Sequence, residues 1–465
     1  MGICGSGAAS IALIAHEQGF EVSGCDLSTD SYYATELKKR GIPIYEGHSE
    51  KHVSNDVDVV AVSPAIFDIS PDNPELREAD RRGILMTWQE FMGKYLQKDR
   101  RVIAVSGTHG KTTTTFLTAE ILIDGKLDPT VEGGSVYKKW KTGGRSGSSD
   151  IFLCEADEFN RNFFHYKPET AVITNVEMDH PECYKDVREV IDAFSWFLKN
   201  DPNLKHLILS GDSPGAVEVL RSALESENVR KAEIVVVFRN EKKFLPVSGV
   251  KLRTVVYRIL KKEGEESRFS VSDGGRLSEF LCRMPGEYNV SNAVMALLAA
   301  RIYGVSDEVI NESLATFSGA GRRFDFVGMM DGVPVYDDYA HHPTEIEALL
   351  TMCREYYPGK RILAVFEPHQ VSRLRLMFRR YVDALTIADY VIIAKTHIGR
   401  EVLKNVMPIS EREWEAASEK IRYEEDPIRQ KAYAKALAKA GKIDMILVIG
   451  AANSYKISRL FVEEE

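Results

Sequence analysis

An apolar run, Val102–Val105, leads directly into a glycine-rich turn and the start of a threonine-rich helix, Ser106-Gly107-Thr108-His109-Gly110-Lys111-Thr112-Thr113. Glycines in such a turn let backbone N–H groups face phosphate oxygens, and the helix N-terminus adds the positive end of its dipole. Lys111 is expected to contact the β- and γ-phosphates of a nucleotide, and the Thr112 hydroxyl to bind Mg²⁺. Val105 stands where the usual pattern has a glycine, and a glycine-rich turn without a ligand is the alternative. The succession of strand, turn and helix predicts a P-loop, Gly107–Thr113, in an α/β domain.

At 465 residues the chain is too long to fold around a single hydrophobic core, so several domains are expected. Short apolar runs alternate with helical stretches, which is typical of parallel α/β units. We predict three such domains: residues 1–97, 98–318 and 319–465. The expected strands are Phe20–Cys25, Val57–Val62 and Ile84–Thr87, then Val102–Val105, Ile151–Leu153, Thr170–Thr174, Leu207–Leu209 and Ile234–Val237, and finally Pro334–Tyr336, Arg361–Phe366, Tyr390–Ala394 and Met445–Ile449. The expected helices include Ser10–Gln18, Ala34–Arg40 and Val290–Ile302.

The first domain has an unusual start. A dinucleotide or UDP-type domain normally opens with a buried strand that leads into its glycine turn. Here Met1 is followed at once by Gly2-Ile3-Cys4-Gly5-Ser6-Gly7. We therefore expect the turn to be present and the first strand to be missing, which would loosen residues 1 to about 95 and weaken binding at the turn.

Charge and composition exclude several classes of partner. The net charge of -9 argues against nucleic acid, because binding to phosphate backbones needs clustered lysine and arginine. No apolar run approaches the roughly 20 residues that span a bilayer, so no membrane insertion is expected. Without a basic and apolar leader, the cytoplasm is the default location. The six cysteines are scattered without metal-ligand spacing and are interpreted as reduced, mostly structural thiols.

Two acidic segments follow predicted strands of the second domain. Cys154-Glu155-Ala156-Asp157-Glu158 follows Ile151–Leu153, and Asn175-Val176-Glu177-Met178-Asp179-His180 follows Thr170–Thr174. Carboxylates at the carboxyl end of a strand beside a P-loop strand are where metal ligands are expected. A solvated acidic loop is the alternative for the first segment, and a purely structural histidine is the alternative for His180.

Two further polar segments are candidates for ligand contacts. Asn289 and Asn292 stand three apart at the start of the Ala-rich helix, so their amides share a helix face and are able to recognise an adenine edge; helix capping is the alternative. The segment 336–345, Tyr-Asp-Asp-Tyr-Ala-His-His-Pro-Thr-Glu, follows a predicted strand. A metal site at His341 and His342 lacks partners at the usual spacing, so a substrate-facing polar loop is preferred.

Together these motifs resemble the Mur ligase family, the amide-forming enzymes of peptidoglycan precursor synthesis. The resemblance is carried in family order by G-T-H-G-K-T-T at 107–113, E-A-D-E at 155–158, N-V-E-M-D-H at 175–180, N-V-S-N at 289–292, R-R-F-D at 322–325 and D-D-Y-A-H-H-P-T-E at 337–345. Within the family, P-H-Q-V-S-R at 368–373 and the start G-I-C-G-S-G are most similar to the members that add L-alanine to UDP-N-acetylmuramate.

The resemblance implies a fold of three domains: a Rossmann-like UDP-sugar domain, a central P-loop ATPase domain and a C-terminal Rossmann-like domain that brings the amino acid. It implies that Lys111 binds the γ-phosphate of ATP, that Thr112 and Glu155 bind Mg²⁺, and that His180 binds a second Mg²⁺. Asn289 and Asn292 would contact adenine, and Arg323 and Asp337 would reach ATP on closure. The UDP-sugar would contact Gly5, Ser6 and Gly7, and the amino acid would lie near Tyr339, His341, His369 and Arg373. The residues with implied catalytic roles are Lys111, His180, Arg323 and His341.

The implied reaction forms an acyl phosphate from the muramate carboxylate and ATP, and the alanine amine then displaces phosphate. Two sequence departures from the family are present. Gln370 replaces a basic residue, which would remove one charge that binds the carboxylate of the amino acid, and Gly450-Ala451-Ala452-Asn453-Ser454 stands where members have G-A-G-D. Two alternatives stay open. One is a recycling ligase that joins a whole peptide to UDP-N-acetylmuramate, and the other is a catalytically silent nucleotide-binding relative, against which the intact Lys111, Glu155 and His180 argue.

Overall fold

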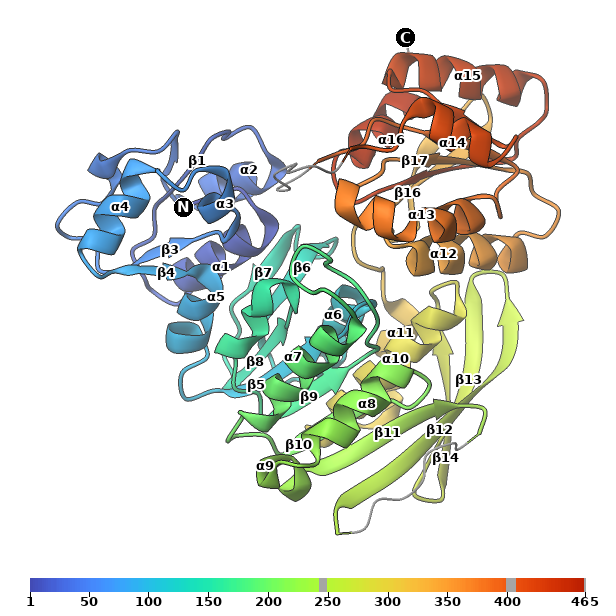
Figure 1. Ribbon diagram of the computed structural model, residues 1–465. Coiled ribbons are helices and arrows are strands. Elements are labelled where there is room, and N and C mark those ends of the chain that lie inside the picture. The colour runs from blue at the N-terminus through green and yellow to red at the C-terminus, as the bar shows by residue number, and fades with distance from the viewer. Residues whose placement is uncertain (242–248, 399–406, 464–465) are drawn as a thin grey trace.

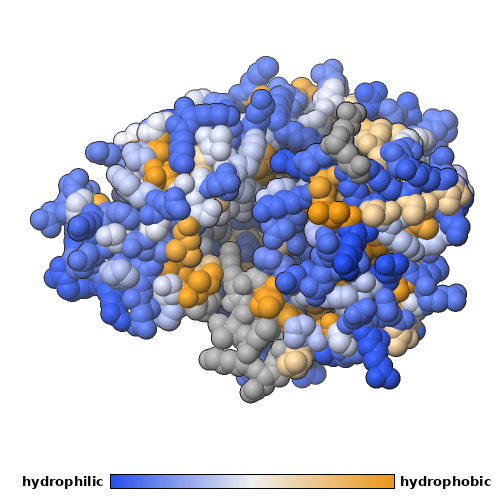
Figure 2. Space-filling model, turned by 90° about the horizontal axis from the view of Figure 1, so that it is seen from above, coloured by the Kyte–Doolittle hydropathy of each residue, from blue (hydrophilic) through white to orange (hydrophobic). Residues whose placement is uncertain are grey.

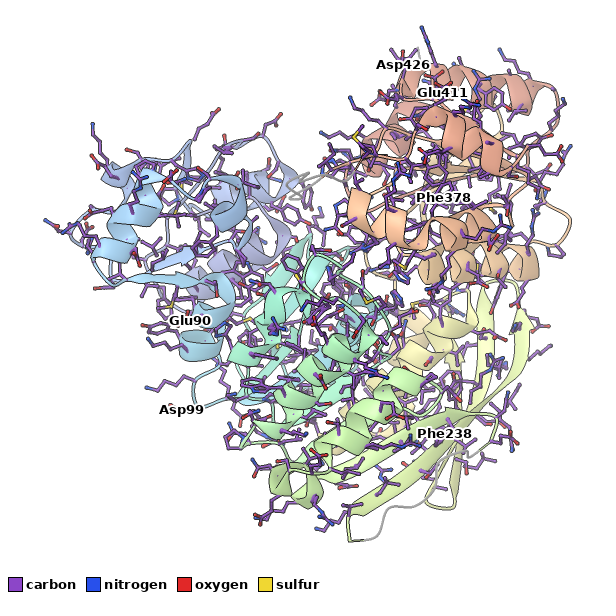
Figure 3. The ribbon with its side chains drawn as sticks, viewed as in Figure 1. Glu90, Asp99, Phe238, Phe378, Glu411 and Asp426 are labelled. Carbon is purple, nitrogen blue, oxygen red and sulfur yellow. The ribbon has the colours of Figure 1, made fainter. Side chains whose placement is uncertain are left out.

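The computed structural model describes residues 1–241, 249–398 and 407–463, which form three α/β units in chain order (Figure 1). In Figure 1 the N-terminal unit (blue) and the C-terminal unit (orange to red) lie on either side above the central unit (green to yellow). The predicted architecture of three α/β domains is confirmed. Glu90 and Asp99 mark the connection from the N-terminal unit to the central one (Figure 3).

The N-terminal unit holds two separate pairs of short parallel strands, β1–β2 and β3–β4, and no ladder joins the pairs in the described residues. As expected, no strand precedes α1 in this part of the structure. Instead the first residues bond to both pairs: the Met1 ammonium donates to the Ala61 carbonyl at 2.7 Å, and Gly2 N–H donates to the Cys25 carbonyl at 2.9 Å. The elements are α1 (Ser6–Glu17), β1 (Gly24–Asp26), α2 (Tyr32–Lys39), β2 (Ile44–Glu46), η1 (Glu50–His52), β3 (Val60–Val62), α3 (Ala65–Ile69), α4 (Pro74–Arg81), β4 (Leu85–Thr87), α5 (Trp88–Phe91) and η2 (Met92–Leu96).

The central unit is built on a ten-stranded sheet in the order β14-β13-β12-β11-β10-β9-β5-β8-β6-β7 among the described residues. Its strands are β5 (Arg101–Ser106), β6 (Thr130–Tyr137), β7 (Thr142–Arg145), β8 (Ile151–Glu155), β9 (Thr170–Ile173), β10 (His206–Ser210), β11 (Glu233–Arg239), β12 (Lys251–Glu263), β13 (Glu266–Asp273) and β14 (Arg276–Cys282). Its helices are α6 (Lys111–Asp124), η3 (Phe159–His165), α7 (Val187–Lys199), α8 (Pro214–Ala223), α9 (Glu227–Lys231), α10 (Glu287–Ile302) and α11 (Asp307–Thr316). The five predicted strands of this unit are all present.

Sequence reasoning missed the antiparallel parts of this sheet. β7 pairs antiparallel with β6, and β12, β13 and β14 form an antiparallel meander. β12 and β14 carry polar residues at exposed positions, and β6 and β7 each contain two glycines. These strands therefore lack the continuous apolar runs by which buried parallel strands are recognised. The parallel core was predictable because both of its faces are covered.

The C-terminal unit has a six-stranded sheet in the order β15-β16-β20-β17-β18-β19 among the described residues, with β15 antiparallel and the other strands parallel. The four predicted strands correspond to β16, β17, β18 and β20, whereas the edge strands β15 and β19 were missed. The elements are β15 (Asp325–Met330), β16 (Val333–Asp338), α12 (Pro343–Tyr356), β17 (Ile362–Phe366), α13 (Val371–Leu385), β18 (Tyr390–Ile393), α14 (Glu411–Ala417), β19 (Ile421–Tyr423), α15 (Pro427–Lys439), β20 (Met445–Ile449) and α16 (Ser454–Val462).

Each large sheet has a hydrophobic core on both faces. In the central unit, α6 and α10 belong to one core and α7 and α8 to the other, which includes the buried Phe238 of β11 (Figure 3). In the C-terminal unit, Phe378 of α13 packs edge-on against Trp414 with ring centroids 4.9 Å apart. Helices therefore cover both faces of each parallel sheet, and the strand ends remain free for polar loops.

None of the helices in the described ranges is long and apolar enough to cross a membrane. Seen from above, the surface is mostly hydrophilic and is hollowed between the N-terminal unit on the left and the C-terminal unit on the right (Figure 2).

Candidate active site

Three adjacent strands of the central sheet end at one edge and bring the predicted motifs together. β5 lies between β8 and β9, with Val105 opposite Glu155 and Ser106 opposite Ile173. The P-loop follows β5, the acidic segment 155–158 extends β8, and the segment 174–180 follows β9. Because the carboxyl ends of parallel strands share an edge, these three segments surround one site.

Two glycines set the path of the P-loop. Gly107 and Gly110 have φ of 134° and 82°, a region that side chains rarely adopt. A Cβ at Gly107 would lie 2.1 Å from Thr174 Oγ1, and one at Gly110 would lie 2.4 Å from Asn292 Oδ1. Glycine is therefore needed at both positions, and α6 begins immediately after the loop with its N-terminal N–H groups directed into the site.

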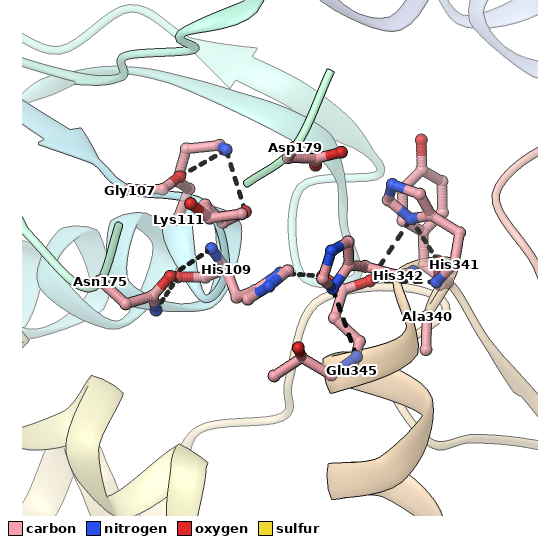
Figure 4. A network of polar contacts seen from close by, with 12 residues as sticks. Gly107, His109, Lys111, Asn175, Asp179, Ala340, His341, His342 and Glu345 are labelled. Carbon is pink, nitrogen blue, oxygen red and sulfur yellow. Dashed lines mark hydrogen bonds and ion pairs between the residues drawn. The ribbon is translucent and has the colours of Figure 1, made fainter. Parts of the chain in front are cut away.

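The side chain of Asn175 fixes the backbone of the loop. Its Oδ1 accepts from the His109 N–H at 2.9 Å, and its Nδ2 donates to the His109 carbonyl at 3.0 Å (Figure 4). The Thr108 hydroxyl accepts from the Glu177 N–H at 2.9 Å, and Thr113 lines the neighbouring cavity. The segment after β9 thus holds the P-loop in place.

Lys111 lies at the centre of an acidic group. Its Nζ donates to the Gly107 carbonyl at 2.6 Å and to Glu158 Oε2 at 2.9 Å, and it lies 4.0 Å from Asp157. Burial acts to lower the pKa of Lys111, but the carboxylates of Glu158, Asp157 and Glu155 outweigh it and raise that pKa. The side chain is therefore charged at neutral pH and lies against the backbone of the P-loop.

Thr112 and Glu155, predicted metal ligands, are in direct contact. The Thr112 hydroxyl donates to Glu155 Oε2 at 2.8 Å, and the same oxygen accepts from the Gly134 N–H at 2.9 Å. A hydroxyl and a carboxylate oxygen at this separation suit Mg²⁺, which prefers oxygen ligands and keeps several waters. The pair fits the first metal position inferred from the sequence.

His180 belongs to a second group, with Asp157 and Glu158. One ligand atom from each of these three residues lies within 4.8 Å of the other two, and Glu158 Oε1 is buried without a hydrogen-bond partner. Burial acts to lower the pKa of His180, but Asp179 and Glu182 outweigh it and raise that pKa to about 8. The carboxylates and the unpartnered oxygen fit a divalent cation, so the sequence prediction of His180 as a ligand gains Asp157 and Glu158 as partners.

Arg373 reaches from α13 of the C-terminal unit to this second group. Its guanidinium lies 2.9 Å from Asp179 and 3.5 Å from His180 Nδ1 and is 1% exposed. Its Nε and Nη1 have no hydrogen-bond partner. Buried donors without partners suit a carboxylate ligand, because leaving them unpaired is costly. Gln370, where a basic residue was expected, donates to Glu182 at 2.9 Å.

The other residues assigned to the amino acid lie beside Arg373. The rings of Tyr339 and His341 have centroids 5.5 Å apart, and those of His341 and His369 are 6.1 Å apart. Burial lowers the pKa of His341 to about 4 and that of His369 to about 2. Both imidazoles are therefore neutral at pH 7, which favours binding of a substrate with a free ammonium group.

A cavity of about 980 Å³ opens between the central and C-terminal units on the other side of the P-loop. Asn289 and Asn292 line it, as does Arg323, whose guanidinium lies 5.4 Å from the centre of the Tyr339 ring. Asn289 is not a helix cap, since its amide donates to the Pro285 carbonyl at 2.7 Å and the cap residue is Gly286. The cavity suits a nucleoside next to the P-loop.

Asp337 was expected to reach ATP when the domains close, and this contact stays a prediction. Asp337 is not among the residues that line the cavity; it pairs with Arg322 at 2.8 Å. Its neighbour Asp338 lines the cavity and accepts from the Phe324 N–H at 2.7 Å, and burial raises the pKa of Asp338 to about 6. The two side chains point to opposite faces because they are successive residues of β16.

Sequence reasoning did not foresee how the P-loop meets the C-terminal unit. His109 Nδ1 lies 3.0 Å from Glu345 of α12, and its Nε2 contacts Glu177 (Figure 4). Burial acts to lower the pKa of His109, but Glu345 and Glu177 raise it to about 9. His342 is buried: its Nδ1 accepts from the Thr344 N–H at 3.2 Å at the start of α12, and its Nε2 lies 3.2 Å from the Met178 carbonyl. The P-loop histidine thus forms one of the charged contacts between the central and C-terminal units.

Gly5 is the N-cap of α1, and Ser6 and Gly7 are the first two residues of this helix in the N-terminal unit, apart from the cavity. A Cβ at Gly7 would lie 2.6 Å from the Trp88 ring, so only glycine allows this approach. Asp26, which was not singled out, accepts from the Cys4 N–H at 2.9 Å and braces the turn from the end of β1. The structure does not bring these residues into the nucleotide site.

Comparison with known proteins explains why the motifs occur together. Residues 1–100 match the family profile described as "Mur ligase family, catalytic domain", residues 105–300 match the Mur ligase middle domain, and residues 322–452 match "Mur ligase, glutamate ligase domain". The UDP-N-acetylmuramate–L-alanine ligase of Aquifex aeolicus is 34% identical over 464 residues, which cover 100% of this chain and 96% of the relative. The chain belongs to the Mur ligase family. The enzyme of the same name from Salinibacter ruber is 32% identical over 473 residues, covering 100% of this chain and 94% of that relative.

Solved structures show the same Mur ligase fold. The crystal structure of UDP-N-acetylmuramate-alanine ligase MurC from Thermotoga maritima superposes with a TM-score of 0.76 at 24% identity, over 99% of this chain and 97% of the other. A murein peptide ligase from Psychrobacter arcticus gives a TM-score of 0.72 at 22% identity, over 99% and 96%. At these sequence identities, the structural similarity shows only that the fold is shared.

Proposed function

We propose that this Mur ligase joins L-alanine to the carboxylate of UDP-N-acetylmuramate at the expense of ATP, in peptidoglycan precursor synthesis. The observation that carries the proposal is the full-length match to relatives of that name, and the charged and polar groups around the P-loop support it. ATP and a UDP-sugar are cytoplasmic metabolites, so the proposal places the enzyme in the cytoplasm.

The nucleotide would lie across the P-loop, with its base in the cavity beside Asn289 and Asn292 and its phosphates against α6. Lys111 would neutralise the γ-phosphate, and Arg323 would approach from the C-terminal unit. Phosphoryl transfer depends mainly on charge neutralisation and in-line positioning. When bound, Mg²⁺ at Thr112–Glu155 and at Asp157–Glu158–His180 would supply further positive charge to the phosphates.

The reaction would proceed in two displacements. The muramate carboxylate oxygen attacks the γ-phosphorus, the bond to the bridging oxygen breaks, and ADP leaves with its electron pair. The alanine ammonium group first loses one proton to solvent, and the resulting amine attacks the acyl carbon. The nitrogen then releases a second proton as the tetrahedral intermediate expels inorganic phosphate, which leaves an amide with one N–H. The alanine carboxylate would pair with the free nitrogens of Arg373, and the neutral His341 and His369 would form the rest of its pocket.

Phosphate release tests the proposal directly. With UDP-N-acetylmuramate and ATP present, L-alanine should stimulate release of phosphate and yield the amide product by mass spectrometry. Stimulation by the tripeptide L-alanyl-γ-D-glutamyl-meso-diaminopimelate but not by L-alanine would identify the recycling ligase instead. ATP binding without phosphate release under either condition would identify a silent relative.

A further inference from the structure

The N-terminal unit contains a group of four metal-ligating side chains that the ligase reaction does not use: Cys25, His48, His52 and Glu75. Cys25 is the middle residue of β1, His48 follows β2, His52 ends η1, and Glu75 lies in the first turn of α4. Burial is nearly complete for Cys25 and Glu75, and the side chains of His48 and His52 are 9% and 21% exposed. We propose that these residues form a binding site for one divalent transition-metal ion of the zinc type.

The separations of the ligand atoms match a single coordination sphere. Cys25 Sγ lies 3.1 Å from both Glu75 oxygens and 3.2 Å from His48 Nδ1. Glu75 Oε2 lies 3.3 Å from His48 Nδ1 and 3.4 Å from His52 Nδ1. Ligands at about 2.0–2.3 Å from a tetrahedral zinc ion are roughly 3.3–3.8 Å from one another. The nitrogen–oxygen separations fall in this range, and the separations from Cys25 Sγ are slightly shorter. One ligand atom each from Cys25, His52 and Glu75 also lies within 4.8 Å of the other two.

The chemistry of the donor set favours zinc over the magnesium of the active site. Thiolate and imidazole ligands select Zn²⁺, whereas Mg²⁺ prefers oxygen ligands in an octahedron. The ion-pair partners of the buried Glu75 carboxylate are His48 and His52, which are charged only when protonated. A divalent cation would compensate this carboxylate and a thiolate together, and burial of such charges is costly without a partner.

The position of the group gives the ion a structural role. Cys25 belongs to the β1–β2 pair, and Glu75 belongs to the helix before β4, so a bound ion would link the two strand pairs that no ladder joins in the described residues. The Cys25 carbonyl accepts from Gly2 N–H, and the next residue, Asp26, holds Cys4 N–H. The ion would therefore brace the back of the glycine turn. Metal binding of this kind contributes directly to folding free energy.

The spacing of these four residues in the sequence does not by itself indicate a metal site. The four ligands are spread over 51 positions, from Cys25 to Glu75. His48 and His52 have the H-x₃-H spacing found in zinc fingers, but no C-x₂-C pair accompanies them. The interpretation of all six cysteines as structural thiols without a metal role is therefore revised for Cys25 only.

The test uses the full-length chain after chelation and dialysis. Zn²⁺ is added by equilibrium dialysis in excess Mg²⁺, and Co²⁺ is used as a spectroscopic probe. We expect one Zn²⁺ per chain, a higher midpoint of thermal unfolding with Zn²⁺, and a near-ultraviolet thiolate-to-cobalt band. The other two candidate groups, His109–Glu177–His342 and Asp157–Glu158–His180, contain no thiolate, so this band reports on the N-terminal site alone.

Variants separate a metal site from a hydrogen-bonded network. Cys25→Ser should abolish the cobalt band. His52→Gln, at the most exposed ligand, should weaken Zn²⁺ binding by at least about tenfold, because substitution of a residue that only hydrogen-bonds to a metal ligand already lowers metal affinity by that much. Cys282→Ser, at a buried thiol of β14, is the matched control and should bind Zn²⁺ like the wild type. Failure of wild-type chain to bind Zn²⁺, or equal binding by His52→Gln, would overturn the proposal and leave a hydrogen-bonded network. If Cys25→Ser does not fold, His52→Gln decides.

Discussion

Replacement of Lys111 by methionine removes a buried charge with two separable roles. In the structure the ammonium group pairs with Glu158 at 2.9 Å, and the side chains of Lys111 and Glu158 are 12% and 1% exposed. Breaking a buried pair by removal of one partner costs about 3–5 kcal/mol, because the other charge is left uncompensated. Burial already raises the pKa of Glu158, so the orphaned carboxyl can take up a proton and reduce that cost.

We therefore expect a loss near the lower end of this range, about 3 kcal/mol, at pH 7. For a domain of the size of the central unit, this corresponds to a fall of roughly 6–12 °C in the midpoint of thermal unfolding. The loss of the charge at the γ-phosphate should reduce kcat by at least about 100-fold, the effect of removing one donor to a developing negative charge.

The double variant Lys111→Met with Glu158→Gln separates the two roles. It removes both charges, so most of the thermal stability should return while turnover stays low. Thermal unfolding without ligands and phosphate release with all three substrates measure the two effects, and binding of UDP-N-acetylmuramate should change little in either variant. Recovery of turnover together with stability in the double variant, or more than a tenth of the wild-type rate in Lys111→Met, would refute the catalytic role.

Four further substitutions test other parts of the site. His180→Ala should raise the Mg²⁺ concentration needed for half-maximal activity, and an unchanged magnesium titration would leave this residue a structural role. The pKa of His109 is raised to about 9 in the folded protein, against about 6.5 in the unfolded chain. Its charged contacts therefore stabilise the fold fully below about pH 6.5, and this stability is lost as the pH rises through about 9. In His109→Gln, the free energy of unfolding measured from pH 7 to 10 should fall less steeply than in the wild type. Gly110→Ala should abolish nucleotide binding. Gly264→Ala is the control: Gly264 has φ of 55° and nothing lies within 4 Å of the new Cβ, so this change should cost only about 1 kcal/mol of stability. Equal effects of the two variants on nucleotide binding would refute the close-contact argument. Arg373→Lys should raise the KM for L-alanine about tenfold or more without changing the KM for ATP, since lysine lacks the bidentate fork; equal changes in both would contradict a role at the amino acid.

Much of the nucleotide site was predictable from sequence because its chemistry is local. Gly107 and Gly110 are required by backbone geometry, and Lys111 and Thr112 follow at the spacing that a helix start demands. The apolar runs of the buried parallel strands were equally visible, since such strands are covered on both faces. The edge strands and the strands of the antiparallel meander were missed because they lack such continuous apolar runs.

Contacts between units were decided by tertiary structure alone. His109 and Glu345 are 236 positions apart, and Arg373 and His180 are 193 apart. No periodicity links such positions, because their meeting depends on how the C-terminal unit docks on the central one. The same holds for Asp338, whose place in the cavity instead of Asp337 was set by the pleat and register of β16. The sequence by itself determined where the glycine-rich turn lies and which strands are buried, since these follow from local geometry and burial. The positions of the charged side chains that meet between the units were determined only by the tertiary structure, because packing brings these distant segments within hydrogen-bond distance.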